Sequence, residues 1–235
     1  MQIAKSERID SEPRTRALID VVLVLCAIAF GWLVSRHLIY PALHVPDAAP
    51  VILRPILGFL MAWYLVRRHG EGWASYGLRR PDSAVQWVGW MVVIIALLWA
   101  SGTYLAAPLA SALNFEPKPD FFGYIHGNTV AFAGWVAISW LVGGFCEELL
   151  FRGFLLSQVS RMFRPGVVAT GVGLIAQALL FGSLHIYQGA FGFAFATITA
   201  TITGAVYLMN GRNLWPLIVA HGAWDTFGMY GLYRG

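Results

Sequence analysis

Charged residues are scarce in this chain of 235 residues. Asp, Glu, Lys and Arg make up 12% of it, whereas hydrophobic residues make up 58%. A soluble domain of this length needs many more charges to cover its surface, so the composition excludes an ordinary soluble protein. The sequence also lacks low-complexity tracts and clear internal repeats.

Cysteine is equally rare. The only two, Cys26 and Cys146, lie within long apolar runs rather than in an extracellular framework, which excludes a disulfide scaffold. We interpret Cys146 as a small apolar packing residue rather than a nucleophile. The formal net charge of +4 does not predict a nucleic-acid partner, because the basic residues sort by side of a membrane.

Long apolar runs are what the chain does have. A helix needs roughly 20 apolar residues to span a bilayer, and runs of this size predict membrane spans. The first run follows a long polar stretch, so we interpret it as an uncleaved span rather than a signal peptide. The sequence therefore predicts an all-α, polytopic transmembrane helical bundle of about seven to eight spans. The seven runs are 17–40, 50–67, 84–107, 129–150, 166–187, 191–209 and 214–232.

Basic residues concentrate in alternate loops, whereas the opposite loops hold little beyond Lys118, with Arg234 near the end of the chain. By the positive-inside rule the N-terminus is cytoplasmic and, with seven spans, the C-terminus is outside. The basic loop 68–83 is expected to lie along the anionic lipids of the inner surface. The basic residues predicted to lie on the cytoplasmic side are Lys5, Arg8, Arg14, Arg16, Arg67, Arg68, Arg79, Arg80, Arg161, Arg164 and Arg212.

These boundaries divide the chain into three parts. Residues 1–16 are predicted to form a cytoplasmic tail, and residues 17–127 the first three transmembrane helices. Residues 128–235 carry the ionisable groups and form the candidate catalytic core. The sequence gives no oligomeric state.

Few ionisable residues occur in the last four spans. Each ion costs about 2.5–3.5 kcal/mol at the centre of a membrane helix, so a set of them is expected to face one cavity within the membrane. This set comprises Glu147, Glu148, Arg152, His185, His221 and Asp225.

Helical spacing sorts these residues. Glu148 and Arg152 are four residues apart in the order that favours an ion pair. Glu147 lies about 100° around the helix and remains the reactive candidate. His221 and Asp225 share one face, so Asp225 is expected to fix the His221 ring or to share a water or a metal with it.

Three short motifs resemble those of a known family. "EELLFR" at 147–152 is similar to the EExxxR motif of the CPBP (CAAX protease and bacteriocin-processing, or Abi) intramembrane proteases. "FGSLH" at 181–185 and "HGAWD" at 221–225 match its FxxxH and HxxxN/D motifs. All three occur in order within residues 143–228, and "YGLRRP" after the second span is also similar to the family.

The resemblance implies a membrane endopeptidase related to CAAX prenyl protease 2, acting on a peptide or protein in or near the membrane. It implies that Glu147 is the general base for a water, that His185 helps to hold this water, and that His221 and Asp225 lie near the oxyanion. A carboxylate is a poor oxyanion donor unless protonated, so we expect Asp225 to orient His221 or to bind a metal. We place the protein in a bacterial cytoplasmic (inner) membrane.

Several alternatives stay open at this stage. Two histidines and a carboxylate suit zinc, with His185, His221 and Asp225 as its ligands, although we favour a mechanism without metal. Buried Glu, His and Asp also make proton relays, so a proton- or ion-coupled carrier is an alternative. A peptide-binding immunity protein that does not cleave is another. The sequence leaves the substrate, and whether it is prenylated, undetermined.

One conflict concerns depth. If the fifth span starts near Pro165, His185 lies about 30 Å along it, whereas His221 lies only about 10 Å along a span that starts at Leu214. The two histidines meet only if a segment is broken or re-entrant, or if the span count is wrong. The candidate positions for a break are Gly171, Gly173 and Gly182.

Overall fold

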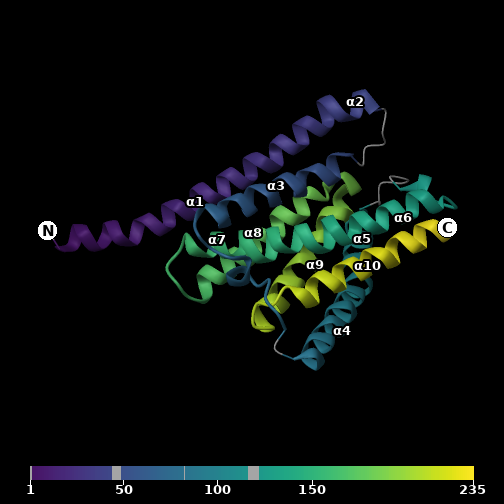
Figure 1. Ribbon diagram of the computed structural model, residues 1–235. Coiled ribbons are helices and arrows are strands. Elements are labelled where there is room, and N and C mark those ends of the chain that lie inside the picture. Colours follow the sequence, from purple (N-terminus) through teal and green to yellow (C-terminus); the bar gives the residue numbers. More distant parts are fainter. Residues whose placement is uncertain (1, 44–48, 82, 116–121) are drawn as a thin grey trace.

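The computed structural model describes residues 2–43, 49–81, 83–115 and 122–235, apart from the side chains of residues 2–12, 41, 43 and 49–51. These residues form helices joined by turns, with no strand among them (Figure 1). The elements are α1 (Gln2–Val34), η1 (Ser35–Ile39), α2 (Tyr40–Leu43), α3 (Ala49–Arg68), η2 (Trp73–Tyr76), α4 (Ala84–Ser101), η3 (Gly102–Ala106), α5 (Ala107–Ala112), η4 (Gly123–Ile125), α6 (Thr129–Ile138), η5 (Ser139–Leu155), α7 (Leu156–Arg161), α8 (Val167–Leu184), η6 (Ile186–Gln188), α9 (Gly189–Met209) and α10 (Trp215–Arg234).

Consecutive elements run on as long helices, which confirms the predicted all-α bundle. Both α3 and α10 are helices of 20 residues near the predicted spans 50–67 and 214–232. They carry buried or half-buried polar side chains and are not among the helices that qualify as spans by length and apolar composition. Those that qualify are Pro13–Ile39, Ala84–Ala112, Thr129–Arg161, Val167–Leu184 and Ile186–Met209.

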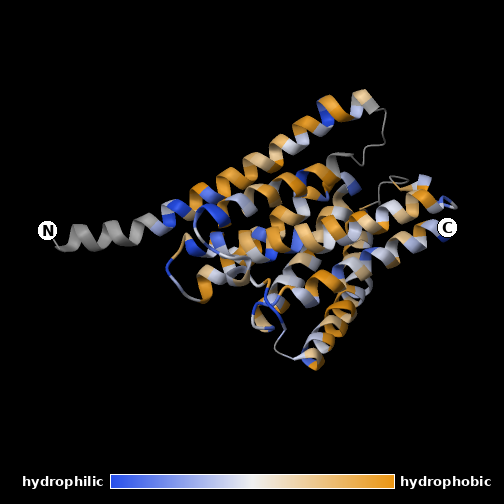
Figure 2. Cartoon of the chain, in the orientation of Figure 1, coloured by the Kyte–Doolittle hydropathy of each residue, from blue (hydrophilic) through white to orange (hydrophobic). Residues whose placement is uncertain are grey.

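The outside of the bundle is apolar. Leu18 and Ile19 on α1 and Trp99 on α4 are about half exposed, and Leu141 on η5 is about two-thirds exposed. Figure 2 shows hydrophobic residues along most of α1, α4 and α6. Such a surface is stable in lipid rather than in water. Together with the five apolar helices it makes the chain a multi-pass integral membrane protein.

The central element is one continuous helix formed by α6, η5 and α7, which packs against α1, α3, α8 and α10. Every residue from Glu147 to Val159 is buried. The helix continues to Arg161, beyond the predicted end at 150, because the charge of Arg152 is paired inside the bundle and does not have to reach water. The η5 stretch is π-helical, a geometry that is frequent at functional sites.

The α8–α9 hairpin packs tightly. Ala196, Ala200 and Gly204 form the predicted stripe of small residues, and all three are buried. A Cβ at Gly204 would lie 2.9 Å from Nε2 of Gln177 on α8, so a larger residue would displace this side chain. Gln177 in turn donates to the Ala200 carbonyl at 3.0 Å. The hairpin therefore fixes the position of its own turn, where His185 lies.

The depth conflict is resolved by where the two helices begin. The first two residues of α8 are 90% and 78% exposed, so this helix starts outside the bundle. In contrast, α10 starts inside it, since Leu214 is fully buried and its N–H donates to the Gly77 carbonyl at 2.9 Å. His185 and His221 therefore lie at a similar depth in the bundle although neither helix is broken. A break at Gly171, Gly173 or Gly182, one of the alternatives that the sequence left open, does not occur, because α8 runs unbroken through all three.

A polar network joins α1, the loop after α3, and α7. Asp20 of α1 is buried and accepts from Gln158 at 3.0 Å and from His69 at 3.1 Å. Glu71 pairs with Arg16 at 2.7 Å. The remaining members are Tyr76, whose hydroxyl donates to Glu71, and Arg161, which donates to Tyr76 at 3.0 Å.

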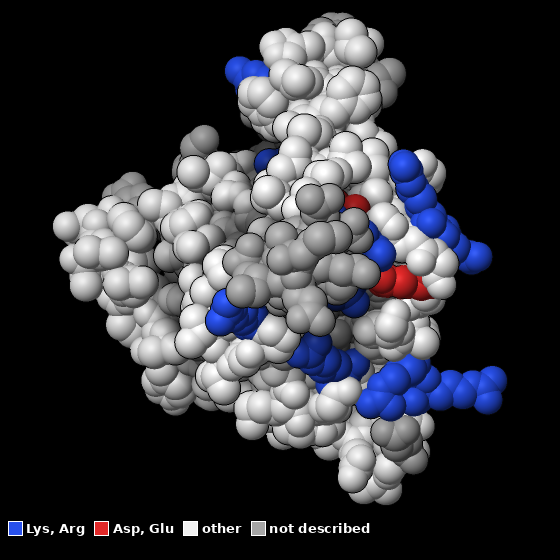
Figure 3. Space-filling view, turned by 90° about the vertical axis from the view of Figure 1, so that its left-hand side faces the viewer, with Lys and Arg blue, Asp and Glu red and all other residues white. Residues whose placement is uncertain are grey.

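This end of the bundle is basic. The polar network holds the start of α1 against the end of α7, and Arg79 donates to the Gly211 carbonyl at 2.9 Å. Figure 3 shows Lys and Arg spread over this end, with much less Asp and Glu. The alternate loops that the sequence marked as basic therefore lie together. The side chains of Lys5 and Arg8 and the whole of Lys118 lie outside the described residues.

Candidate active site

Glu148 is held by Arg152 and His221 inside the bundle. Its Oε1 lies 2.8 Å from Nδ1 of His221 and 3.2 Å from Nη1 of Arg152. Arg152 also donates to Thr203 at 2.8 Å and lies over the Phe181 ring, with Cζ 4.5 Å from its centroid. Glu148 and Arg152 are 1% and 2% exposed, so this is a buried ion pair with further hydrogen bonds to stabilise it.

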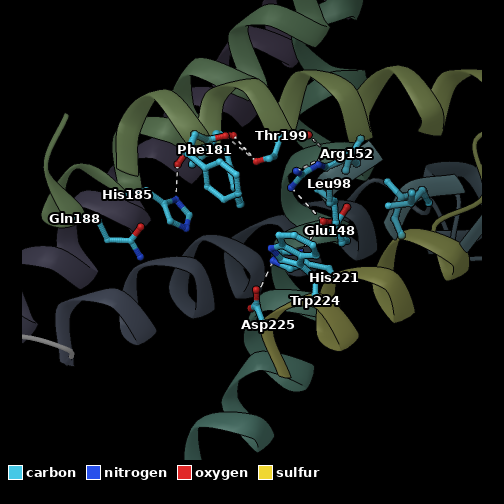
Figure 4. A pocket seen from close by; sticks show the side chains of 15 residues that line it. Leu98, Glu148, Arg152, Phe181, His185, Gln188, Thr199, His221, Trp224 and Asp225 are labelled. Carbon is cyan, nitrogen blue, oxygen red and sulfur yellow. Dashed lines mark hydrogen bonds and ion pairs between the residues drawn. The ribbon is translucent and has the colours of Figure 1, made fainter. Parts of the chain in front are cut away.

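His221 lies between two carboxylates. Its Nδ1 is bonded to Glu148, and its Nε2 lies 3.7 Å from Oδ2 of Asp225 (Figure 4). The first contact is a hydrogen bond, whereas the second is too long for one and is electrostatic. Glu148 therefore fixes the ring, and Nε2 is the nitrogen that faces the cavity. Because Nδ1 is held by an acceptor, its proton stays on that side of the ring.

His185 ends α8 and begins the turn to α9. Its Nδ1 contacts the Phe181 carbonyl at 2.9 Å, and its ring lies 4.6 Å from the Phe181 ring. Figure 4 shows the side chains of His185 and Gln188 on one side of the cavity, with those of His221 and Asp225 on the other. With Nδ1 bonded to the backbone, Nε2 is the nitrogen of His185 that is left for a ligand.

Glu147 differs from its neighbour. Its side chain is 8% exposed, and no hydrogen bond or ion pair joins it to another described residue. A buried carboxylate without a protein partner retains both oxygens for a water or a substrate. Glu148 therefore points into the ion pair and Glu147 into a cavity. The two neighbours differ in direction, as the helical spacing predicted.

Two adjoining cavities bring the predicted residues together. One, of about 140 Å³, is lined by Glu148 and Arg152, and the other, of about 130 Å³, by Glu147. Each is large enough for several water molecules. The residues that line both are His185, Gln188, His221 and Asp225.

A pair of glycines lets η5 approach α10. A Cβ at Gly143 would lie 3.0 Å from Oδ2 of Asp225, and one at Gly144 would lie 2.8 Å from the Ile218 carbonyl oxygen. Carbon and oxygen atoms that are not bonded do not approach to 2.8 Å without displacement. The two glycines therefore set the distance between the glutamates on η5 and His221 on α10.

The arrangement was tested for a metal site. Among the described residues, no three or more His, Cys, Asp or Glu side chains are placed to hold one ion. Glu148 engages one nitrogen of His221 and leaves Nε2 available, and a metal-bound histidine commonly has its other nitrogen held by a carboxylate in this way. Zinc binding by His185, His221 and Asp225 stays a prediction.

Several lining residues were not singled out from the sequence. Tyr187 and Gln188 lie two and three residues after His185, and both line the cavity of Glu147. Thr203, which binds Arg152, belongs to a run of small and hydroxyl residues that predicts packing only. The Glu148–His221 bond joins two helices, and no spacing within either helix predicts it.

Residues 129–227 match a protein-family model described as "Rce1-like: Type II CAAX prenyl endopeptidase Rce1-like". Comparisons with curated proteins and with solved structures found no match. The matched segment starts at the first residue of α6 and ends within α10, so it includes the three motifs and all six candidate site residues. The resemblance predicted from the motifs is confirmed by this match, which makes residues 129–227 similar to the Rce1-like CAAX endopeptidases.

Proposed function

We propose that the protein is an intramembrane endopeptidase in which Glu147 activates a water for attack on a peptide bond. The observation that carries this proposal is that the two adjacent glutamates have different surroundings. Glu148 is bound to Arg152 and His221, whereas Glu147 has no partner among the described residues and lines a cavity with both histidines. The family match indicates a protease independently.

The attack begins at Glu147. One carboxylate oxygen takes a proton from a water that Nε2 of His185 helps to hold, and the water oxygen bonds to the scissile carbonyl carbon. When the carbon–nitrogen bond breaks, the proton on Glu147 passes to the leaving amine. A cavity of about 130 Å³ beside Glu147, large enough for several water molecules, supports this role, as does the lack of a competing partner for Glu147 among the described residues.

The carbonyl oxygen becomes negative during the attack and needs a donor. His221 is suited to this role because Glu148 fixes its ring and its Nε2 faces the cavity. When both ring nitrogens carry a proton, Nδ1 donates to Glu148 and Nε2 is available to the oxyanion. Asp225, 3.7 Å from Nε2, balances the charge of the ring in the resting site.

We propose that the substrate is a peptide or protein anchored in or near the membrane. The cavities lie within apolar helices, so a substrate reaches them from the lipid or its surface. The family description reads "Type II CAAX prenyl endopeptidase", and we include prenylated CAAX peptides among the substrates to be tested. We also propose a metal-free, glutamate-type reaction.

We further propose that the basic end of the bundle lies on the cytoplasmic side of a bacterial inner membrane. The clustering of Lys and Arg at one end supports this orientation under the positive-inside rule (Figure 3). A cysteine-accessibility scan in intact cells tests it. Reporter cysteines near Arg80 are expected to react only after the cells are opened.

The test of the function uses the purified protein in vesicles with a panel of membrane-anchored peptides, some prenylated. Glu147→Gln is expected to abolish cleavage of every substrate that the wild type cuts, because the amide cannot take the proton. Cys146→Ala is the matched control: it changes the adjacent residue and is expected to retain activity. Loss of activity in Cys146→Ala with retention in Glu147→Gln would overturn the assignment.

A further inference from the structure

A second and larger cavity lies at the basic end of the bundle, away from the candidate active site. It has a volume of about 460 Å³ and is bordered by the start of α1, the end of α7 and the start of α8. No residue lines both this cavity and either cavity of the active site. Its polar lining includes Arg14, Arg161, Arg212, Ser75, Ser157 and Thr170.

The charge of this lining is positive. Among the described residues, three arginines contribute to it and no carboxylate does. Arg161 is partly neutralised by Glu71 at 3.5 Å, but among the described residues neither Arg14 nor Arg212 has an ion pair. Guanidinium groups bind phosphate oxygens in pairs of hydrogen bonds, and hydroxyl groups add further donors. The cavity is therefore suited to a phosphate group.

The border of the cavity is apolar. Phe163 lines it and is 44% exposed, and Val167 and Val168, next to Gly166 of the lining, are 90% and 78% exposed. Leu18 on the neighbouring α1 is 51% exposed. A free phosphate ion does not bury an apolar surface, whereas the acyl chains of a lipid do.

We propose that this cavity binds the phosphate headgroup of an anionic phospholipid, whose acyl chains lie along the exposed apolar residues of α1 and α8. Because Arg161 also belongs to the polar network that joins α1 to α7, a lipid bound there stabilises the packing of these two helices. Figure 3 shows Lys and Arg side chains at this end of the molecule, a distribution that favours contact with an anionic membrane surface.

The test compares lipid binding to the full-length protein and to variants outside the polar network. Native mass spectrometry from nanodiscs measures retained phosphatidylglycerol, with phosphatidylcholine as the neutral lipid. Arg14→Gln and Arg212→Gln are each expected to weaken phosphatidylglycerol binding about fivefold. Arg80→Gln, an exposed arginine of the same end that does not line the cavity, is the matched control and is expected to change it little.

A second arm distinguishes the lipid from free phosphate. Phosphatidylglycerol is expected to raise the melting temperature of the wild type, and millimolar inorganic phosphate is not. A photoreactive phosphatidylglycerol is expected to label the segment 157–170. The proposal is overturned if Arg80→Gln weakens binding as much as Arg14→Gln, if phosphatidylcholine binds equally well, or if inorganic phosphate alone gives the full stabilisation.

Discussion

Replacing Gly144 by alanine tests whether the spacing of η5 and α10 controls the active site. The new Cβ would lie 2.8 Å from the Ile218 carbonyl oxygen and 3.4 Å from the Gly222 nitrogen. Since 3.4 Å is where ordinary contact begins, the two helices must separate locally by about 0.6 Å. Overpacking of this kind lowers the free energy of unfolding by about 1–3 kcal/mol.

The same displacement moves His221 away from the glutamates. A misplacement of about 1 Å lowers the rate of an enzyme by roughly 10²-fold, so Gly144→Ala is expected to lower the cleavage rate about 10- to 100-fold. Gly134→Ala is the matched control. It lies on the same continuous helix, where a Cβ meets nothing within 4 Å. This variant is expected to retain both activity and stability.

The assay follows a membrane-anchored peptide whose cleavage depends on Glu147, and the melting temperature is measured on the same samples. Gly144→Ala is expected to lower both readings relative to Gly134→Ala. If Gly144→Ala instead cleaves as fast as the control at the same melting temperature, the glycine does not set the geometry, and our reasoning about the contact of η5 with α10 is wrong.

Other changes probe the buried charges and the polar network. Arg152→Met removes the arginine partner of Glu148 and is expected to lower the unfolding free energy by about 3–5 kcal/mol, measured by denaturant titration in micelles. The double variant Glu148→Gln/Arg152→Met is expected to lose less stability than the sum of the losses in the two single variants. Burial alone would raise the pKa of the Glu71 carboxyl, but Tyr76 and its two arginine partners outweigh burial and hold this pKa below the usual value. The stability due to ionised Glu71 is therefore full above the pKa of the unfolded state and is lost as the pH falls through the lower folded pKa, so acid is expected to lower the melting temperature less in Glu71→Gln than in the wild type. Chelation of divalent metals is expected to leave the cleavage rate unchanged, and a reversible loss that zinc restores would refute the metal-free proposal.

The convergence of six ionisable residues could be predicted from the sequence. Charges are expensive in apolar helices, and this cost alone requires that Glu147, Glu148 and the two histidines face an interior cavity. The different surroundings of the two glutamates also followed from helical spacing, because neighbours on a helix point in different directions. These predictions depend on periodicity and on the cost of burial, which are properties of single helices.

Features that depend on how helices meet could not be predicted. The bond between Glu148 and His221 joins residues 73 positions apart, and the sequence of neither helix predicts which residue of the other helix it contacts. The depth conflict arose because apolar runs do not show where a helix begins relative to the bundle. Burial of Leu214 and exposure of Val167 decide this, and both depend on the packing of neighbouring segments.

The polar network at the basic end limits how the chain can be shortened. Gln158 and Arg161 belong to the family segment, yet they bind Asp20 and Glu71, which precede that segment by a long stretch of sequence. Expression of residues 129–227 alone would leave the donors Gln158 and Arg161 without these acceptors and would expose the apolar side of α7. A minimal protease fragment, or a chimaera made by exchanging the family segment between relatives, therefore has to carry the first two long helices with it.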